Sequence, residues 1–264
     1  MAFRLSTFAG VTLPAYNWTM DFSTPMTRNP VVPTLNGAID FYGTRRRIEH
    51  AQDFELDAMP EASTAAASIR ALKTLVGRTG YLVRVDRDGS NELQRYCRLL
   101  AVGFQPKATQ RGIENRLMMR FWSNQPFWRS ASLTTHGPTT LTTTTTNMAI
   151  TVAGEEDILD AVLAIEASSA ISALEISHTK TENGETITSK LEYAASLAAG
   201  HTLTIDSGQY TVDDDGSDAY ADFSLHADHD EVYWLRLPPG SQTITIVRTG
   251  GGGTATLSYY PQYQ

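Results

Sequence analysis

The sequence predicts a mainly β protein, in which the first half combines one helix with a sheet and the second half contains only strands. Three observations lead to this prediction. Apolar and polar residues alternate along several short segments, and a period of two is typical of half-buried strands. Asp-Gly pairs and clusters of Pro and Gly separate these segments as turns do. One longer stretch, residues 60–77, instead repeats its apolar residues every three or four positions, as a helix does.

The composition is that of a globular protein. Of the 264 residues, 41% are hydrophobic and 19% are charged, which excludes a disordered chain. No run of about 18 apolar residues is present, so we expect no membrane span, and the polar N-terminus indicates no signal peptide. The single cysteine, Cys97, excludes an intrachain disulfide. We expect it to be buried in a strand of a protein that folds in a reducing compartment.

Charge divides the chain near residue 133. Residues 1–133 carry a net charge of +6 and residues 134–264 one of −14, which indicates two units that face different neighbours. Between them, residues 134–147 are rich in threonine, whose β-branching disfavours helix. This segment is either a flexible linker or a strand that connects two domains. We therefore predict a first domain over residues 1–133 and a second over residues 134–264.

The basic residues of the first domain are scattered, so we expect no sequence-specific binding of nucleic acid. Arg45, Arg46 and Arg47 form the one dense cluster. The cluster is either a solvated turn or a salt-bridging contact to an acidic neighbouring subunit. The subunit contact is our functional prediction for these three arginines.

The helix predicted over residues 60–77 has plausible ends. Pro60 fits a first helical turn, and Glu61 complements the helix dipole beside it. Small alanines on the apolar face would let the helix pack closely on a sheet. Gly77 and Gly80 are both able to end it.

Strands follow the helix in the first domain. Residues 81–85 and 93–104 are predicted to pair through a hairpin turn at Asp88 and Gly89. The next strand alternates strictly, with Met119 and Phe121 on one face and Arg120 on the other, as in a half-buried antiparallel strand. An aromatic-rich turn follows over residues 122–128.

The second domain is predicted to be a β-sandwich or a jelly roll. Its turns fall at an Asp-Gly pair, at a Pro-Pro-Gly run and at four consecutive glycines. Residues 155–165 fit either a short helix or a strand flanked by loops. The strands that we predict cover residues 202–206, 210–212, 232–237, 242–248 and 254–260.

No set of residues in the sequence forms a recognisable catalytic site. The glycine run 250–253 has no Lys-Ser/Thr and no helix after it, so it is not a phosphate-binding loop. The acidic run 213–218 lacks the alternating ligands of a calcium loop and fits a hairpin turn better. We therefore predict that the protein is not an enzyme and has no catalytic residues, no cofactor and no metal.

Two other functions stay open. His226 and His229, among acidic neighbours, would suit a metal-assisted hydrolase, although in a strand or loop the two imidazoles would project to opposite sides. A carbohydrate-binding module for host-surface attachment is the main alternative, because exposed aromatic rings stack on sugars, although packing is the commoner use of such rings. The aromatic residues concerned are Tyr233, Trp234, Tyr259, Tyr260 and Tyr263.

Four segments of the chain, taken in order, resemble the distal tail protein family of siphophages. They are residues 36–40 with 60–89, residues 117–128, residues 199–206, and residues 234–246 with 255–261. Their order and spacing, over nearly the whole chain, carry the resemblance more than any single segment does. The residues that match the family's motifs, and for which we predict a structural role, are Pro126, Phe127, Trp128, Gly200, Asp206, Trp234, Pro239 and Gly240.

The resemblance implies a function as well as a fold. It implies an N-terminal ring-forming domain and a C-terminal galectin-like sandwich. It also implies a homohexameric ring at the tail tip of the virion, assembled in the host cytoplasm, between the tail-tube protein and the hub or baseplate protein. The tape-measure protein and the DNA would pass through its channel. Some members carry a large carbohydrate-binding insertion in the C-terminal half, for which this chain has no room.

Overall fold

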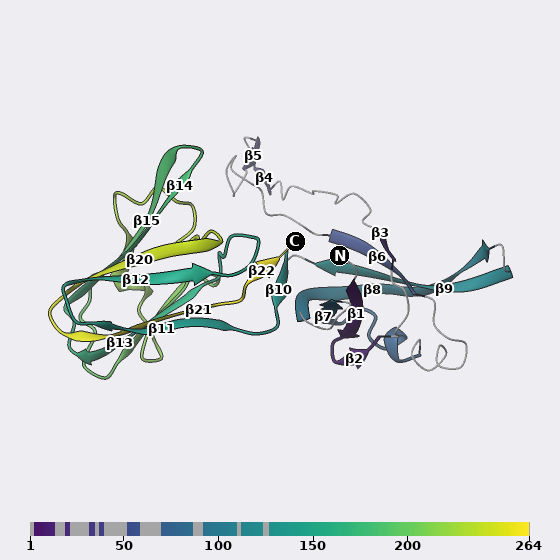
Figure 1. The fold of residues 1–264 in the computed structure, drawn as a ribbon, viewed down its shortest axis with the longest axis horizontal. Coiled ribbons are helices and arrows are strands. Elements are labelled where there is room, and N and C mark those ends of the chain that lie inside the picture. The colour runs from purple at the N-terminus through teal and green to yellow at the C-terminus, as the bar shows by residue number, and fades with distance from the viewer. Residues whose placement is uncertain are drawn as a thin grey trace. The chain divides into compact units, whose positions relative to one another are not determined.

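The computed structural model describes residues 3–13, 19–21, 32–34, 37–39, 52–58, 70–86, 92–109, 112–123 and 127–263. The chain divides into two compact units, Met1–Ala131 (unit 1) and Ser132–Gln264 (unit 2) (Figure 1). Strands dominate both units, which confirms the mainly β prediction. Within the described ranges no helix is both long and apolar enough to span a bilayer.

Unit 1 is built on one antiparallel sheet with the strand order β2-β1-β7-β8-β9-β6-β3, and β10 pairs with β8. A separate hairpin pairs β4 (Val32–Thr34) with β5 (Gly37–Ile39). The strands of the sheet are β1 (Phe3–Phe8), β2 (Val11–Thr12), β3 (Thr19–Asp21), β6 (Gln52–Ala58), β7 (Thr79–Asp86), β8 (Glu92–Thr109), β9 (Gly112–Ser123) and β10 (Trp128–Ser130).

The core of unit 1 lies on one face of this sheet. Met119 and Phe121 are fully buried while Arg120 between them is exposed, so the alternation predicted for β9 is confirmed. The ring of Phe8 meets that of Phe121 edge-on, with 5.1 Å between the ring centres. Cys97 is also buried, as predicted, and burial raises the pKa of its thiol to about 12.

The helix of unit 1 is described only at its C-terminal end. Residues 70–73 are helical and a turn follows, in which Gly77 has a φ of +87° and ends the helix as predicted. The start expected at Pro60 lies outside the described residues. The expectation that Gly80 also ends the helix is wrong, because Gly80 belongs to β7. A Cβ there would come within 2.6 Å of the Cβ of Ala9, so close strand packing explains this glycine.

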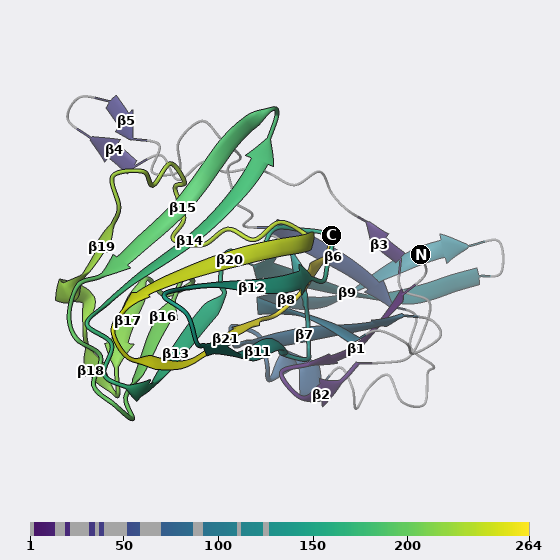
Figure 2. The same ribbon diagram turned by 60° about the vertical axis from the view of Figure 1, so that its left-hand side comes forward.

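Unit 2 is a sandwich of two antiparallel sheets around one hydrophobic core (Figure 2). The strand orders are β11-β21-β13-β16-β17-β18 and β12-β20-β14-β15-β19. A single turn of 3-10 helix, η1 (Tyr220–Asp222), precedes β19. The strands of the unit are β11 (Thr134–Leu141), β12 (Thr145–Val152), β13 (Val162–Ser169), β14 (Ala173–Glu182), β15 (Glu185–Tyr193), β16 (Thr202–Asp206), β17 (Thr211–Asp214), β18 (Ser217–Asp218), β19 (Phe223–Leu225), β20 (Gly240–Thr249), β21 (Gly252–Tyr259) and β22 (Gln262–Tyr263).

Three expectations for unit 2 are settled by its strands. The threonine-rich segment forms β11 and the start of β12, so it is not a flexible linker. Residues 155–161 are irregular and lead into β13, so the strand flanked by a loop is right and the helix is wrong. The strand expected over residues 232–237 is also wrong. Trp234 and Leu235 are both buried, which a strand with one buried face does not allow.

Candidate functional site

The motif residues predicted from the sequence occupy packing and turn positions. Trp128 is buried in β10, and the guanidinium of Arg84 lies 4.9 Å from the centre of its ring. Gly200 has a φ of +84°, a conformation that glycine adopts without strain. Asp206 ends β16, where one carboxylate oxygen accepts two backbone N–H groups of the following turn at 2.8 and 2.9 Å.

The remaining predicted residues lie at the starts of strands. Phe127 is half-buried before β10, Pro239 is exposed, and Gly240 begins β20 with a φ of +97°. Pro126 and the arginine cluster at 45–47 lie outside the described residues. The subunit contact assigned to that cluster therefore stays a prediction, as does the shared family role of the motif residues.

Trp234 is the centre of an aromatic cluster in unit 2. Its ring centre lies 4.5 Å from that of Phe223, 5.3 Å from that of Tyr210 and 5.9 Å from that of Tyr220. Trp234 and Phe223 are buried, whereas Tyr210 is 44% exposed and Tyr220 is 53% exposed. Two buried rings thus support two exposed tyrosines, which sequence reasoning missed because only the fold brings them together.

The cluster changes the set of rings that could stack on a sugar. Trp234 and Tyr259, both considered for that role, are buried. The hydroxyl of Tyr259 accepts the backbone N–H of Ala153 at 3.1 Å and donates to the carbonyl of Thr151 at 3.2 Å. These two rings are therefore committed to the interior and offer no open face for stacking.

Buried charges lie on the inward face of β14. Leu174 and Ile176 begin this face, and His178 and Lys180 continue it beyond the apolar core. The Nζ of Lys180 lies 2.5 Å from a carboxylate oxygen of Glu231, and both side chains are only 6% exposed. A pair this deeply buried costs desolvation energy and is maintained only while both charges are present.

Arg236 extends the pair into a network. Its guanidinium lies 2.6 Å from Asp157, 3.1 Å from Glu182 and 3.7 Å from Glu231. Desolvation alone would raise the pKa of Glu182. The positive charges of Arg236 and then Lys180 outweigh it and hold this pKa below its ordinary value. The network joins the irregular segment 226–239 to the β14–β15 hairpin, so its role is to hold that segment against the sheet.

His178 makes the stability of unit 2 depend on pH. The side chain is buried, with Nε2 3.0 Å from the amide oxygen of Gln242. Burial, together with the charge of Lys180, lowers the pKa of His178 despite the hydrogen bond with Gln242. Below about pH 6.5 the unfolded chain takes up a proton that the folded protein resists. The stabilisation is therefore present above the unfolded-state pKa and is lost as the pH falls toward the folded-state pKa.

We expect urea unfolding to show a lower free energy of unfolding at about pH 5.5 than at about pH 7.5, a window above the titration of most carboxylates. The variant His178→Gln keeps a hydrogen-bonding side chain but has no proton to take up, so this difference should shrink. An unchanged difference in His178→Gln would show that His178 is not its source.

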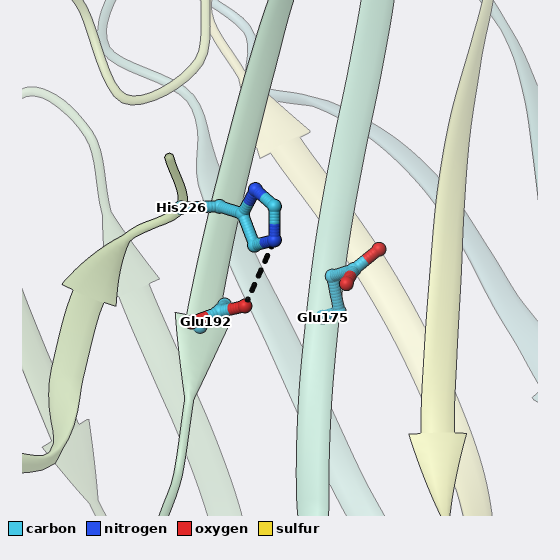
Figure 3. Close-up of side chains that lie close together, drawn as sticks. All are labelled: Glu175, Glu192 and His226. Atoms are coloured by element: carbon cyan, nitrogen blue, oxygen red, sulfur yellow. Dashed lines mark ion pairs between the residues drawn. The ribbon is translucent and has the colours of Figure 1, made fainter. Parts of the chain in front are cut away.

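Two side chains on the outward face of the β14–β15 hairpin and one from the segment after β19 lie close enough to hold a metal ion. One ligand atom from each of Glu175, Glu192 and His226 lies within 4.8 Å of the others (Figure 3). The register places Glu175 directly opposite Glu192, and like charges in this position destabilise a sheet unless they are countered.

Neighbouring groups already counter these two carboxylates. The Nζ of Lys190 lies 3.4 Å from Glu175, and the Nε2 of His226 lies 3.5 Å from Glu192. The backbone N–H of Asp228 donates to the Nδ1 of His226 at 3.0 Å, so a neutral ring carries its proton on Nε2, which faces Glu192. Nε2 would have to lose this proton to bind a metal. These contacts favour an ion-pair cluster over a metal site.

His229, the second imidazole considered from the sequence, points elsewhere. Its Nδ1 accepts the backbone N–H of Lys190 at 2.9 Å. It therefore stabilises the edge of β15 and is not part of the cluster formed by Glu175, Glu192 and His226.

In unit 1, the outer face of the sheet combines aromatic and basic side chains. Tyr81 lies opposite Tyr96 across β7 and β8, and Arg98 lies opposite Trp122 across β8 and β9, so the four share one face. The three aromatic side chains are 37–39% exposed, and the guanidinium of Arg129 lies 5.0 Å from the ring centre of Tyr81. Aromatic residues and arginine are the side chains that protein interfaces favour.

The β8–β9 pair extends beyond the rest of this sheet (Figure 1). β7 pairs with β8 only as far as Arg98, and β6 pairs with β9 only from Leu117 onward. The β8–β9 ladder continues past both limits, to the pair of Thr109 and Gly112. The result is a two-stranded ribbon whose outer edges pair with no other described strand. Such edges are suited to adding a strand from another chain.

Similarity to solved structures extends over the whole chain. The chain is similar to the Dit protein of phage SPP1, with 12% identity, a TM-score of 0.58 and 100% of both chains covered. Two baseplate structures of phage P2, in the activated conformation with Ca or Sr, match at 9% identity, with TM-scores of 0.39 and 0.36, 98% and 97% of this chain covered and 90% of theirs. No family model and no curated protein matches the sequence. The resemblance seen in the sequence is thus confirmed at the level of fold: the described part of the chain shares its fold with the Dit protein of phage SPP1.

Proposed function

We propose that the chain is a structural, non-enzymatic distal tail protein that forms a homohexameric ring at the tip of a phage tail. The observation that carries the proposal is the likeness to the Dit protein of phage SPP1 over the full length of both chains. In this proposal the ring joins the tail-tube protein to the hub or baseplate protein. Its channel admits the tape-measure protein and the DNA, and the ring is assembled in the host cytoplasm.

Two surfaces of unit 1 support a ring. A closed ring of identical subunits needs two different surfaces on each subunit, one for each neighbour. The outer sheet face with Tyr81, Tyr96 and Trp122 offers one surface of suitable chemistry. The β8–β9 ribbon offers backbone edges as the other. The Arg45–Arg47 cluster would add a contact to an acidic neighbour.

Native mass spectrometry of the full chain tests the ring. We expect a hexamer, either alone or after mixing with the tail-tube and hub proteins. The double variant Tyr81→Ser, Trp122→Ser should stay folded by circular dichroism but remain monomeric, because the interface loses two aromatic anchors. Val232→Ser, which changes a 59% exposed residue of unit 2, should still assemble. A folded wild-type chain that stays monomeric with both partners and is absent from virions would contradict the proposal.

A further inference from the structure

The strongest unassigned surface of the molecule is the exposed tyrosine pair of unit 2. Tyr210 meets the ring of Trp234 edge-on and Tyr220 stacks on it, so one buried ring supports two exposed tyrosines. Tyr210 also has a φ of +55°, a conformation that bulky residues rarely adopt and that Asn or Gly accepts more readily.

The segment of the chain that carries the pair is acidic in sequence. Between Lys190 and Arg236 the sequence has ten Asp and Glu residues and no Lys or Arg. Tyr220 follows Asp218, whose carboxylate accepts the Tyr220 backbone N–H at 3.0 Å. In the same unit, the hydroxyl of Tyr193 donates to Asp214 at 3.4 Å, and burial, then the negative charges of Asp214 and Asp222, raise the pKa of Tyr193.

These carboxylates are not arranged around a cation of their own. Asp213 accepts the backbone N–H of Gly216 at 2.6 Å, and Asp214 lies 2.9 Å from the Nδ1 of His201. Among the described residues the only group with metal-binding spacing is the separate one on β14, β15 and His226. Asp215 and Asp218 are exposed, so their negative charge is open to solvent, where it favours cationic side chains.

From the exposed rings and the charge around them, we infer that the Tyr210–Tyr220 surface binds a lysine- or arginine-bearing segment of a partner protein. The tyrosine rings offer faces for cation–π contact with ammonium or guanidinium groups. Exposed carboxylates of the same segment, such as Asp215 and Asp218, offer charge-assisted hydrogen bonds to the same groups. A neutral sugar would use the rings but not this charge, and a phosphate-bearing polymer would be repelled by it. The surface lies on unit 2 and is independent of the ring contacts proposed for unit 1.

Fluorescence anisotropy with a labelled octa-arginine peptide and the full-length protein tests this inference. We expect saturable binding that weakens steeply as salt rises from about 50 to about 300 mM. The double variant Tyr210→Ser, Tyr220→Ser keeps every charge. Its affinity for the peptide should fall about tenfold, because the cation–π contacts are lost. Asp215→Asn, Asp218→Asn should weaken binding and reduce its salt dependence. Glu166→Gln, an exposed carboxylate on β13, should leave binding unchanged.

Two results would overturn the inference. One is equal affinity in the wild type and the double tyrosine variant, which would reduce the binding to non-specific charge. The other is saturable binding of a neutral cell-wall polysaccharide at the same tyrosines with no binding of the peptide. Thermal melting by circular dichroism shows that each variant is folded. Native mass spectra of the tyrosine variant should match those of the wild type, so failure of the ring and failure of this surface are distinguishable.

Discussion

The variant Lys180→Met is expected to lower the free energy of unfolding of unit 2 by about 3–5 kcal/mol. Lys180 and Glu231 are the most deeply buried ion pair among the described residues, at 6% exposure each. Methionine fills a similar volume but leaves the Glu231 carboxylate with only the guanidinium of Arg236, 3.7 Å away. A buried carboxylate without its close partner must be protonated or hydrated, and both cost stability.

The double variant Lys180→Met, Glu231→Leu is the matched control. It removes both charges, so the desolvation penalty disappears and most of the stability should return. Urea unfolding of the full chain, followed by circular dichroism, measures all three proteins. If the single variant lost less than about 1 kcal/mol, the pair would behave as an exposed salt bridge and its burial would be in doubt.

The variant Trp234→Ala is expected to cost about 3–5 kcal/mol, the range for removing a large aromatic side chain from a packed interior. Trp234 packs on Phe223 and so holds the irregular segment 226–239 against the rest of unit 2. Leu235 and Leu237 beside it are fully buried. Removing the indole empties the centre of the aromatic cluster. It should also release Tyr210 and Tyr220 from their support. The affinity for the arginine peptide should therefore fall together with the free energy of unfolding.

Val232→Ala serves as the control in the same segment. Val232 is 59% exposed, and truncating it should change the free energy of unfolding by less than about 0.5 kcal/mol. The comparison is made by thermal melting of the full chain. Equal losses in the two variants would mean that the segment as a whole is stabilising and that Trp234 is not its anchor.

Local pattern predicted the regular parts of the fold well. The alternation of Met119, Arg120 and Phe121 reflects a strand with one buried face, and this alternation can be recognised from neighbouring residues alone. In unit 2 the same period predicted β16, β17, β20 and β21, whereas β14 and β15 were not predicted. The strand predicted over residues 232–237 was wrong because this irregular segment buries Trp234 and Leu235 in succession in the core, without ladder pairing.

The candidate surfaces could not be predicted, because they depend on contacts between distant residues. Nothing near Lys180 in the sequence indicates that Glu231 will be its partner. Tyr210 and Tyr220 look like ordinary turn residues, and only the fold brings both rings into contact with Trp234. The same limit applies to His226. Its ring contacts Asp228, which is close in the sequence, but also Glu192 on β15, which the sequence does not indicate.

The overhang of the β8–β9 ribbon has a consequence for how assembly can be observed. Two strands without flanking neighbours are only marginally stable in water, so their amide protons exchange by local opening at low free energy. The part of the same ladder flanked by β7 and β6 is held by the whole sheet. A neighbouring chain that added a strand to the ribbon would slow exchange there and leave the rest of unit 1 as it was. Deuterium uptake along this single hairpin therefore distinguishes a free subunit from a docked one without an attached probe.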